Sequence, residues 1–418
     1  MIKYKNGNLN VESVDVSRIV NKVETPFYCY SYNKILDQYR GLADALSSSK
    51  VSIYFAVKAN SNLSIIKTLA KEGAGADVVS LGELKRCLMA GVDPKKIVFS
   101  GVGKTTEEIA EALTKDIFQI NVESEAELIN INAIAKSLGK VAMIGLRVNP
   151  DVDAKTHEKI TTGKKENKFG IDLKDAPIFF SKASTLPNVS MKSLAVHIGS
   201  QLLELSPYKA AYKKIAEMTR YLRAAGHEIS HLDLGGGLGI PYSDESLADL
   251  YAYNQIIVET VGDLDCKLSI EPGRYLVGEA GILITRVIYI KQGDQKKFVI
   301  VDGAMNDLIR PTLYDGFHAI VPVTEKNLSF QKSLCDVVGP ICESGDYFAK
   351  DRMLPEISQN DLLAIKCSGA YGAVMASNYN SRPLIPEVLV SNDAFSVIRE
   401  RQTFEKMMQD EKIAAWLQ

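Results

Sequence analysis

The stretch Ile53–Asn60, IYFAVKAN, joins an apolar and aromatic run to a lysine. A run such as Ile53–Val57 is typical of a buried strand, whereas lysine is among the residue types least often buried. Lys58 therefore stands where the predicted strand ends. Taken alone, this pattern is most simply explained by a strand that reaches the surface. Whether the lysine has a function has to be judged from the rest of the sequence.

From residue 51 onward, strand-like and helix-like segments alternate. Helical spacing and end signals occur in 62–73, which stops at a glycine, and in 105–115, where Thr105 with a glutamate soon after resembles a capping box. Eight such strands predict a (β/α)8 barrel of about 250 residues, and an open doubly wound sheet is the alternative with the same alternation. The eight apolar runs are 51–57, 75–79, 96–100, 117–122, 141–148, 192–198, 229–234 and 267–270.

The pattern changes after Glu271. The segment 281–303 has the pattern of strand, turn and strand, and short strands separated by Gly, Asn and Asp turns continue beyond it. We therefore predict a C-terminal β-sandwich or Greek-key β-barrel domain. The barrel is expected over 28–272, and the β domain over 1–27 and 273–418, with a helical segment at 395–417.

Length and composition are those of an ordinary globular protein. The chain has 418 residues, enough for two domains, with 46% hydrophobic and 24% charged residues. A net charge of −2 gives no electrostatic argument for nucleic acid or an anionic membrane. We find no uninterrupted apolar run of about 18 residues and no signal-peptide pattern. The six cysteines are scattered without metal-ligand spacing, so we expect free thiols, no metal site and a cytoplasmic location.

Chemically capable residues follow several of the predicted strands. Lys58, Asn149, His197, Gly235–Gly237 and Glu271 stand after strands one, five, six, seven and eight. In a barrel these positions converge on the face where active sites lie. Each position has an ordinary structural explanation, but packing does not readily explain the whole set.

The glycine loop in HLDLGGGLGIPY (231–242) allows close approach of backbone amides to a phosphate, or it simply forms a tight turn. It lacks the Lys-Ser/Thr of a P-loop, and it lies late in the chain, which argues against a first-strand dinucleotide site. The loop after strand seven is the usual phosphate site of a barrel.

Two strand-end residues have competing interpretations. Glu271 in EPGR (271–274) could hold a protonated ring nitrogen, and Arg274 could pair with a carboxylate or phosphate; a strand-end salt bridge is the alternative. His197 could be a catalytic residue or a packed core histidine.

The second domain offers a thiol and two tyrosines. Cys342 lies in a loop-like segment, GPICESGD (339–346), and could donate a proton, or it is an ordinary free cysteine. Tyr371 and Tyr379 lie in SGAYGAVMASNYNSRP (368–383), where small neighbours would let an aromatic side chain enter a cavity. Aromatic packing between two strands is the alternative.

Together these motifs identify a family. In order, they are AVKAN (56–60), HIGSQ (197–201), DLGGGLGIPY (233–242), EPGRY (271–275), CESGD (342–346), GAYG (369–372) and SNYNSRP (377–383). From about residue 20 to about residue 400 the chain resembles the fold-type III pyridoxal-phosphate decarboxylases, most closely those that act on meso-2,6-diaminopimelate. The segments 75–84 and 99–109 depart from the common pattern, and we expect neither to touch a site residue.

The resemblance implies a role for each matching residue. Lys58 would bond covalently to pyridoxal 5'-phosphate, His197 would stack on the ring, and Glu271 would pair with the ring nitrogen. Cys342 would donate the proton, from a loop supplied by the other subunit of a homodimer, so Lys58, His197 and Cys342 are the catalytic candidates. The cofactor would further contact Ser200, Gly236, Gly237, Pro272, Gly273, Arg274 and Tyr371, and the substrate's distal end would contact Arg274, Arg310, Tyr314, Glu343 and Tyr371.

The implied reaction converts meso-2,6-diaminopimelate to L-lysine and CO2, the last step of lysine biosynthesis. Diaminopimelate has a second amino-acid head group; Arg274 and Arg310 suit its carboxylate, and Glu343 suits its ammonium. Decarboxylation of lysine, ornithine, arginine or carboxynorspermidine is the alternative within the family. An inactive binding relative would not need Lys58, Glu271 and Cys342, a cofactor-homeostasis protein lacks the β domain, and an alanine racemase is not expected to have CESGD.

Overall fold

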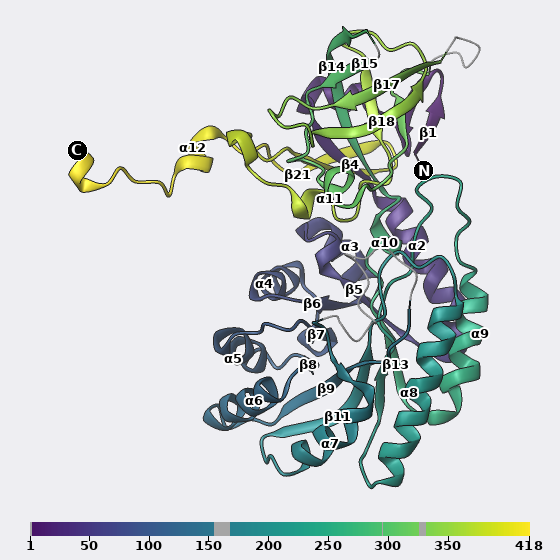
Figure 1. Ribbon diagram of the computed structural model, residues 1–418, viewed down its shortest axis with the longest axis vertical. Coiled ribbons are helices and arrows are strands. Elements are labelled where there is room, and N and C mark those ends of the chain that lie inside the picture. Colours follow the sequence, from purple (N-terminus) through teal and green to yellow (C-terminus); the bar gives the residue numbers. More distant parts are fainter. Residues whose placement is uncertain (1, 154–167, 295, 326–331) are drawn as a thin grey trace. The chain divides into compact units, whose positions relative to one another are not determined.

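The computed structural model describes residues 2–153, 168–294, 296–325 and 332–418. The chain divides into two compact units, one of Ile35–Val277 and one that combines Met1–Lys34 with Gly278–Gln418 (Figure 1).

The unit Ile35–Val277 contains the predicted parallel barrel. Its strands pair in the order β5-β6-β7-β8-β9-β11-β12-β13, and β13 pairs again with β5, where Ile270 lies opposite Ile53. A short further strand, β10 (Ile171–Asp172), pairs with β9. The strands are β5 (Ser52–Ala56), β6 (Gly75–Val78), β7 (Ile97–Phe99), β8 (Gln119–Val122), β9 (Ala142–Asn149), β11 (Val189–Val196), β12 (His231–Asp233) and β13 (Lys267–Ile270). All eight predicted strands are therefore confirmed, and the closed order excludes the open sheet.

Local sequence signals explain where the barrel helices begin. Asn62 caps α3 through its side chain, and Thr105 forms with Glu108 the predicted capping box of α5. The helices lie outside the strands (Figure 1). They are α2 (Tyr32–Ala45), α3 (Leu63–Lys71), α4 (Leu81–Ala90), α5 (Thr106–Thr114), α6 (Glu125–Ser137), α7 (Ala176–Ser184), α8 (Ser206–Ala224), α9 (Leu250–Val261) and α10 (Arg274–Val277).

The other unit is built on a nine-stranded sheet, in agreement with the predicted β domain. Its main path is β18-β17-β15-β14-β4-β20-β21, and β19 joins it through β14 and β16. A three-stranded sheet and helix α1 supply Leu9, Val11 and Ile19 to a core that also contains Phe27 and Ile282. The elements are β1 (Ile2–Lys5), β2 (Asn8–Val11), β3 (Val14–Asp15), α1 (Val16–Val23), β4 (Phe27–Ser31), β14 (Gly281–Gln292), β15 (Lys297–Val301), α11 (Arg310–Tyr314), β16 (Ile320–Pro322), β17 (Ser333–Val338), β18 (Tyr347–Leu354), β19 (Leu362–Ile365), β20 (Glu387–Ser391), β21 (Ala394–Arg399) and α12 (Phe404–Met408).

The division between the units differs from the predicted boundaries at 28 and 272. The boundary at 28 assigned residues 28–31, most of β4, to the barrel domain, but β4 pairs antiparallel with β14 and parallel with β20. Its partners lie more than 240 residues away in sequence, so the local pattern could not indicate the sheet to which it belongs. At the other end, α10 stays with the barrel unit.

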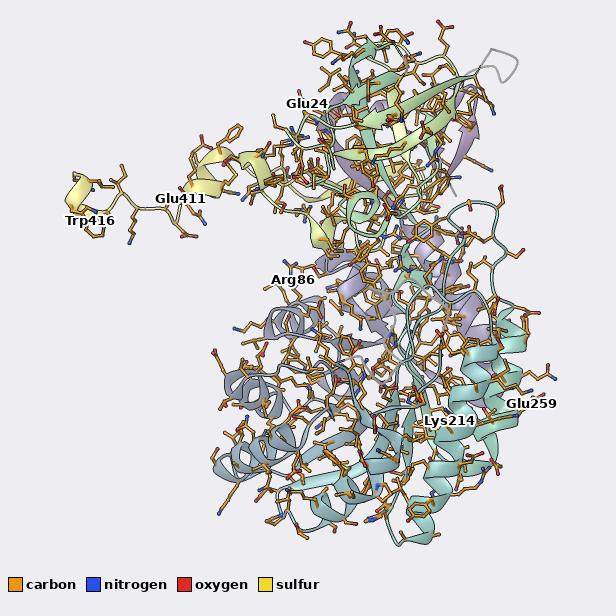
Figure 2. The ribbon with its side chains drawn as sticks, viewed as in Figure 1. Glu24, Arg86, Lys214, Glu259, Glu411 and Trp416 are labelled. Atoms are coloured by element: carbon orange, nitrogen blue, oxygen red, sulfur yellow. The ribbon has the colours of Figure 1, made fainter. Side chains whose placement is uncertain are left out.

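The predicted helical segment at 395–417 is largely wrong. Its first residues belong to β21, which pairs with β20, and α12 has only five residues. Figure 2 shows the chain beyond α12 extending away from the sheets of its own unit to Trp416, which is 86% exposed. No helix in the described part of the chain is long and apolar enough to cross a membrane.

Candidate active site

A cavity of about 400 Å³ opens at the carboxyl ends of the barrel strands. Residues on, or directly after, all eight strands contribute to its wall, as the barrel topology requires. The lining polar residues are Lys58, Asp77, Ser100, Asn121, Arg147, His197, Asp233 and Glu271.

Lys58 enters this cavity from a turn rather than from a strand. Strand β5 ends at Ala56, and a single 3₁₀ turn, Val57–Ala59, carries the lysine. Its Nζ lies 2.6 Å from Oδ2 of Asp77, a fully buried carboxylate on β6. Asp77 belongs to the segment 75–84, so the expectation that this segment touches no site residue is wrong.

His197 lies one residue beyond the end of β11. The backbone N–H of Gly236 donates to its Nδ1 over 3.2 Å, which places the proton of a neutral imidazole on Nε2. Burial lowers the pKa of His197 well below its usual value, and the positive charges of Arg147 and Lys58 act in the same direction. The histidine is therefore neutral.

Glu271 and Asp233 form a carboxyl pair. Burial raises the pKa of Glu271 well above its usual value, with further contributions from Asp233 and Asp77. Asp233 accepts hydrogen bonds from the Gly235 amide at 3.0 Å and from Asn121 at 3.4 Å, so the shared proton resides on Glu271. Among the described residues, Oε1 of Glu271 has no hydrogen-bond partner. A cationic ring nitrogen at this position would satisfy that atom.

The glycine loop packs between strand ends where no side chain fits. A Cβ on Gly235 would lie 2.1 Å from the carbonyl oxygen of Val196, and one on Gly236 would lie 2.1 Å from that of Glu271. Gly237, at φ +100°, has the carbonyl oxygen of Gly199 2.4 Å from its Cβ position. These glycines keep a cradle of bare backbone at the carboxyl ends of β11, β12 and β13.

Arg274 and Ser200, both of which were predicted to contact the cofactor, hydrogen-bond to each other. Nη2 of Arg274 donates to Oγ of Ser200 at 3.2 Å, and Nη1 donates to the hydroxyl of Tyr242 at 2.6 Å. Gly273 is another position where no side chain fits, because a Cβ there would lie 2.9 Å from the Cβ of Ala59. The backbone cradle, the buried arginine and the partnerless carboxyl oxygen fit pyridoxal phosphate, which has a phosphate at one side and a ring nitrogen at the other.

Five polar residues of this wall were not predicted from the sequence: Asp77, Ser100, Asn121, Arg147 and Asp233. Ser100 directly follows β7, and the other four lie inside barrel strands. Arg147 donates to Glu123 at 3.1 Å and lies over the ring of Phe169 at 4.9 Å. A polar residue inside an otherwise apolar predicted strand was the signal that could have found them.

The remaining predicted residues lie in the other unit, at three separate places in its sequence. Arg310 and Tyr314 begin and end α11, Cys342 and Glu343 form an exposed loop between β17 and β18, and Tyr371 follows β19. Tyr371 has φ +55°, a left-handed conformation that is uncommon outside glycine and concentrates at functional sites. The cofactor candidates other than Tyr371 thus lie in the barrel unit, and the distal-substrate candidates other than Arg274 lie in the β unit.

Arg310 is held by a buried histidine. Nδ1 of His318 lies 2.8 Å from the carbonyl oxygen of Lys366, which can only accept, so this nitrogen carries the proton. Nε2 of His318 therefore accepts from Nη1 of Arg310, at 2.6 Å. The guanidinium is oriented before any substrate binds.

The Cys342 loop and α11 are tied together within the β unit. Asp346 closes the loop by accepting the amide protons of Ile341 and Met305, each at 2.6 Å. Thr312 of α11 donates its hydroxyl proton to the carbonyl of Gly345 at 2.5 Å. The structure therefore brings the predicted arginine helix and the predicted cysteine loop into one local arrangement.

Residues 32–278 match the model of the pyridoxal-dependent decarboxylases, specifically their pyridoxal-binding domain. The chain belongs to this family. Membership identifies pyridoxal phosphate as the cofactor that the barrel cavity accommodates.

Relatives of this pyridoxal-dependent decarboxylase match it over almost its whole length. Diaminopimelate decarboxylase of Zymomonas mobilis is 46% identical over 418 residues, which cover 99% of each chain. The crystal structure of diaminopimelate decarboxylase from Helicobacter pylori complexed with L-lysine has a TM-score of 0.91 at 45% identity, covering 94% of this chain and 98% of that one. The M. jannaschii enzyme in co-complex with L-lysine has a TM-score of 0.95 at 37% identity, covering 100% of this chain and 99% of that one.

Proposed function

We propose that this decarboxylase removes CO2 from one head group of meso-2,6-diaminopimelate and releases L-lysine, as the final step of lysine biosynthesis in the cytoplasm. The strongest support is the near-complete match to diaminopimelate decarboxylases, together with the cavity that gathers Lys58, His197 and Glu271. When bound, the cofactor supplies the electron sink for the bond that breaks.

The barrel residues would hold and tune the cofactor. Lys58 provides the amine that bonds to it covalently, and Asp77 positions that amine. The cradle of Gly236, Gly237 and the backbone from Glu271 to Arg274, with Ser200, receives the phosphate. Neutral His197 would pack on one face of the ring without placing a second positive charge beside it. Oε1 of Glu271 would accept a hydrogen bond from the protonated ring nitrogen.

The β-unit residues would bind the substrate and finish the reaction. Arg310 and Arg274 suit the distal carboxylate, Glu343 suits the distal ammonium, and Tyr314 and Tyr371 line the same end of the substrate. Cys342 donates its thiol proton to the carbon that has lost CO2, so an S–H bond breaks, a C–H bond forms and a thiolate remains. A substrate with only a distal amine would offer Arg310 no carboxylate to bind, which disfavours lysine and ornithine.

We infer that the active enzyme is a homodimer in which the Cys342 loop of one subunit completes the barrel site of the other. Cys342, Glu343 and Ser344 are exposed within a single chain, although the proposed chemistry needs water excluded from the proton donor. A second subunit would provide that cover.

Release of CO2 from a substrate panel tests the substrate. The panel contains meso-diaminopimelate, lysine, ornithine, arginine and carboxynorspermidine, and we expect turnover of the first alone. Lys58→Ala should abolish both turnover and the yellow absorbance of covalently held cofactor, whereas Lys67→Ala, an exposed change on α3, should alter neither. A preference for any of the other four substrates would contradict the proposal.

Mixing two inactive variants tests the shared site. Alone, the Lys58→Ala protein should not turn over, and the Cys342→Ala protein should turn over slowly. Random reassociation makes about half of the dimers mixed, each with one intact site, so about a quarter of wild-type activity should return. No recovery after verified subunit exchange would show that each site is built from one chain.

A further inference from the structure

His318 links two parts of the β unit that carry predicted substrate residues. Its Nε2 accepts a hydrogen bond from Nη1 of Arg310 over 2.6 Å, and its Nδ1 donates to the carbonyl oxygen of Lys366 over 2.8 Å. Arg310 begins α11, whereas Lys366 directly follows β19 and leads into the segment that bears Tyr371. The histidine is completely buried, and Arg310 is 7% exposed. One imidazole ring therefore bridges the arginine helix and the tyrosine segment.

The backbone around His318 is fixed from two sides. Nη1 of Arg352, on β18, donates to the carbonyl oxygen of His318 over 3.0 Å, and the guanidinium carbon of Arg352 lies 4.0 Å from the centre of the Phe317 ring. On the other side, the amide of Lys366 donates to the carbonyl oxygen of Ala319 over 2.8 Å, which extends the pairing of β16 with β19. Because both ring nitrogens are bonded as well, the imidazole has little freedom to rotate.

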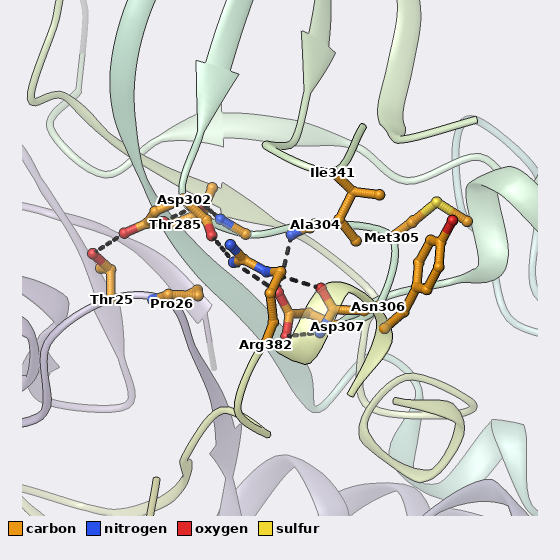
Figure 3. A network of polar contacts seen from close by, with 12 residues as sticks. Thr25, Pro26, Thr285, Asp302, Ala304, Met305, Asn306, Asp307, Ile341 and Arg382 are labelled. Atoms are coloured by element: carbon orange, nitrogen blue, oxygen red, sulfur yellow. Dashed lines mark hydrogen bonds and ion pairs between the residues drawn. The ribbon is translucent and has the colours of Figure 1, made fainter. Parts of the chain in front are cut away.

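A separate polar network holds the chain that leads into α11 (Figure 3). Asp307 accepts from the amide of Ala304 at 2.9 Å and from the side chain of Asn306 at 3.3 Å. Nε of Arg382 donates to the side-chain oxygen of Asn306 at 3.1 Å. The network fixes the backbone just before Arg310, so the direction of its guanidinium depends on the contacts of the side chain.

The guanidinium of Arg310 packs against both His318 and Gly316. Nη2 of Arg310 lies 3.4 Å from the position that a Cβ on Gly316 would take, and the amide of Gly316 donates to the carbonyl oxygen of Arg310 at 3.2 Å. Since arginine can only donate, Nε2 of His318 accepts as a neutral nitrogen. It orients the guanidinium without placing a negative charge beside it, whereas a carboxylate at the same position would repel an anionic ligand.

We propose that His318 is a positioning residue for substrate specificity, because it fixes the guanidinium of Arg310 for a distal carboxylate and ties it to the segment that bears Tyr371. Arginine binds a carboxylate best through two parallel hydrogen bonds, so the plane of the guanidinium matters. An arginine that is already oriented loses less side-chain entropy on binding, and more of the interaction contributes to affinity. This inference rests on the proposed function, in which Arg310 binds the distal carboxylate, and adds a residue to it.

Two substitutions separate the two hydrogen bonds of His318. The amide of His318→Asn can still donate to the carbonyl of Lys366 but does not reach Arg310, whereas the longer His318→Gln places an oxygen acceptor near the position of Nε2. We expect His318→Asn to raise KM for meso-diaminopimelate about tenfold, the size of one hydrogen bond to a charged group. The dissociation constant of L-lysine, which keeps the distal head group, should rise by a similar factor in calorimetry. His318→Gln should recover most of this loss, and kcat and the cofactor absorbance should stay close to wild type in both variants.

Arg310→Ala provides the background in which His318 should no longer matter. His318→Asn should weaken L-lysine binding in the wild-type background and no further in Arg310→Ala, because no guanidinium remains to be oriented. His227→Asn is the matched control, since His227 is a half-buried histidine after α8 of the barrel unit, and it should alter neither constant.

Three results would overturn the role of His318: equal weakening of L-lysine binding in both backgrounds, equal losses in the Asn and Gln variants, or an unchanged affinity for L-lysine in His318→Asn. If Arg310→Ala alone leaves this affinity unchanged, or if the wild-type enzyme does not decarboxylate meso-diaminopimelate, the proposed function itself fails. The two failures are therefore distinguishable.

Discussion

Nζ of Lys58 lies 2.6 Å from Oδ2 of Asp77, and Asp77 is completely buried whereas the lysine side chain is 36% exposed. The buried aspartate therefore relies on the lysine to compensate its charge, whereas water can also solvate the partly exposed lysine. Among the described residues, the other oxygen of Asp77 has no hydrogen-bond partner. Removing the lysine would leave a buried, uncompensated charge.

We predict that Lys58→Ala destabilises the cofactor-free protein by about 1–3 kcal/mol, a value reduced for the exposure of the lysine. The double variant Lys58→Ala/Asp77→Asn should recover most of this loss, because no charge remains to be paired. Thermal unfolding of the barrel unit measures both, and Lys67→Ala serves as the surface control. Equal midpoints for the single and double variants would show that the pair contributes nothing.

A methyl group on Gly236 should damage the cofactor site. Its Cβ would lie 2.1 Å from the carbonyl oxygen of Glu271, so Gly236→Ala has to displace the strand end that carries the glutamate. We expect at least tenfold weaker cofactor binding, measured by titrating cofactor-free protein, because even small displacements of binding groups are costly.

Gly41→Ala provides the matched control for that change. Gly41 lies in α2 with no atom within 4 Å of its Cβ position. Alanine there should leave cofactor binding intact and stabilise the helix by up to about 1 kcal/mol. Unchanged binding in Gly236→Ala would show that the loop does not form the cradle.

Asp346 should matter for turnover and not for cofactor binding. Its carboxylate accepts the amides of Met305 and Ile341 and so closes the loop that bears Cys342. We expect Asp346→Ala to lower kcat at least tenfold while the cofactor absorbance stays normal, since charge-assisted hydrogen bonds are worth about 1.5–3 kcal/mol each. Asp393→Ala, on an exposed turn of the same unit, is the control; a normal kcat in Asp346→Ala would separate the loop from catalysis.

Asp307 should make the stability of the β unit depend on pH. Burial raises the pKa of Asp307 to about 7, and the charge of Asp302 also raises it. The amide of Ala304, which donates to the carboxyl, lowers this pKa, as do the charges of Arg382 at 3.9 Å and of Arg401, but burial outweighs them. Between about pH 4 and pH 7 the folded state holds a proton that the unfolded state has lost. The free energy of unfolding should therefore fall as pH rises through this window and stay level above pH 7.

Asp307→Asn should remove this dependence, because asparagine can accept from Ala304 without ionising. The variant should match the wild type at about pH 4 and exceed it at pH 8 by a few kcal/mol, measured as unfolding midpoints across that range. Asp393→Asn should follow the wild type at every pH. A variant no more stable than wild type at pH 8 would mean that Asp307 does not hold its proton.

The sequence determined the parts of this protein that depend on short-range pattern. Apolar runs that alternate with helical segments, which are marked by caps and terminal glycines, predicted all eight barrel strands. The residues at the ends of those strands included Lys58, His197 and Glu271. Pairing between distant segments was invisible to such patterns, so β4 was placed in the barrel and β21 in a helix. Only the tertiary structure decided which polar residues meet: Asp77 with Lys58, Asp233 with Glu271, and Arg310 with His318. The physical reason is that hydrogen bonds and ion pairs depend on distances of a few ångströms between residues that the chain separates, and a sequence pattern specifies the face of an element but not its neighbour.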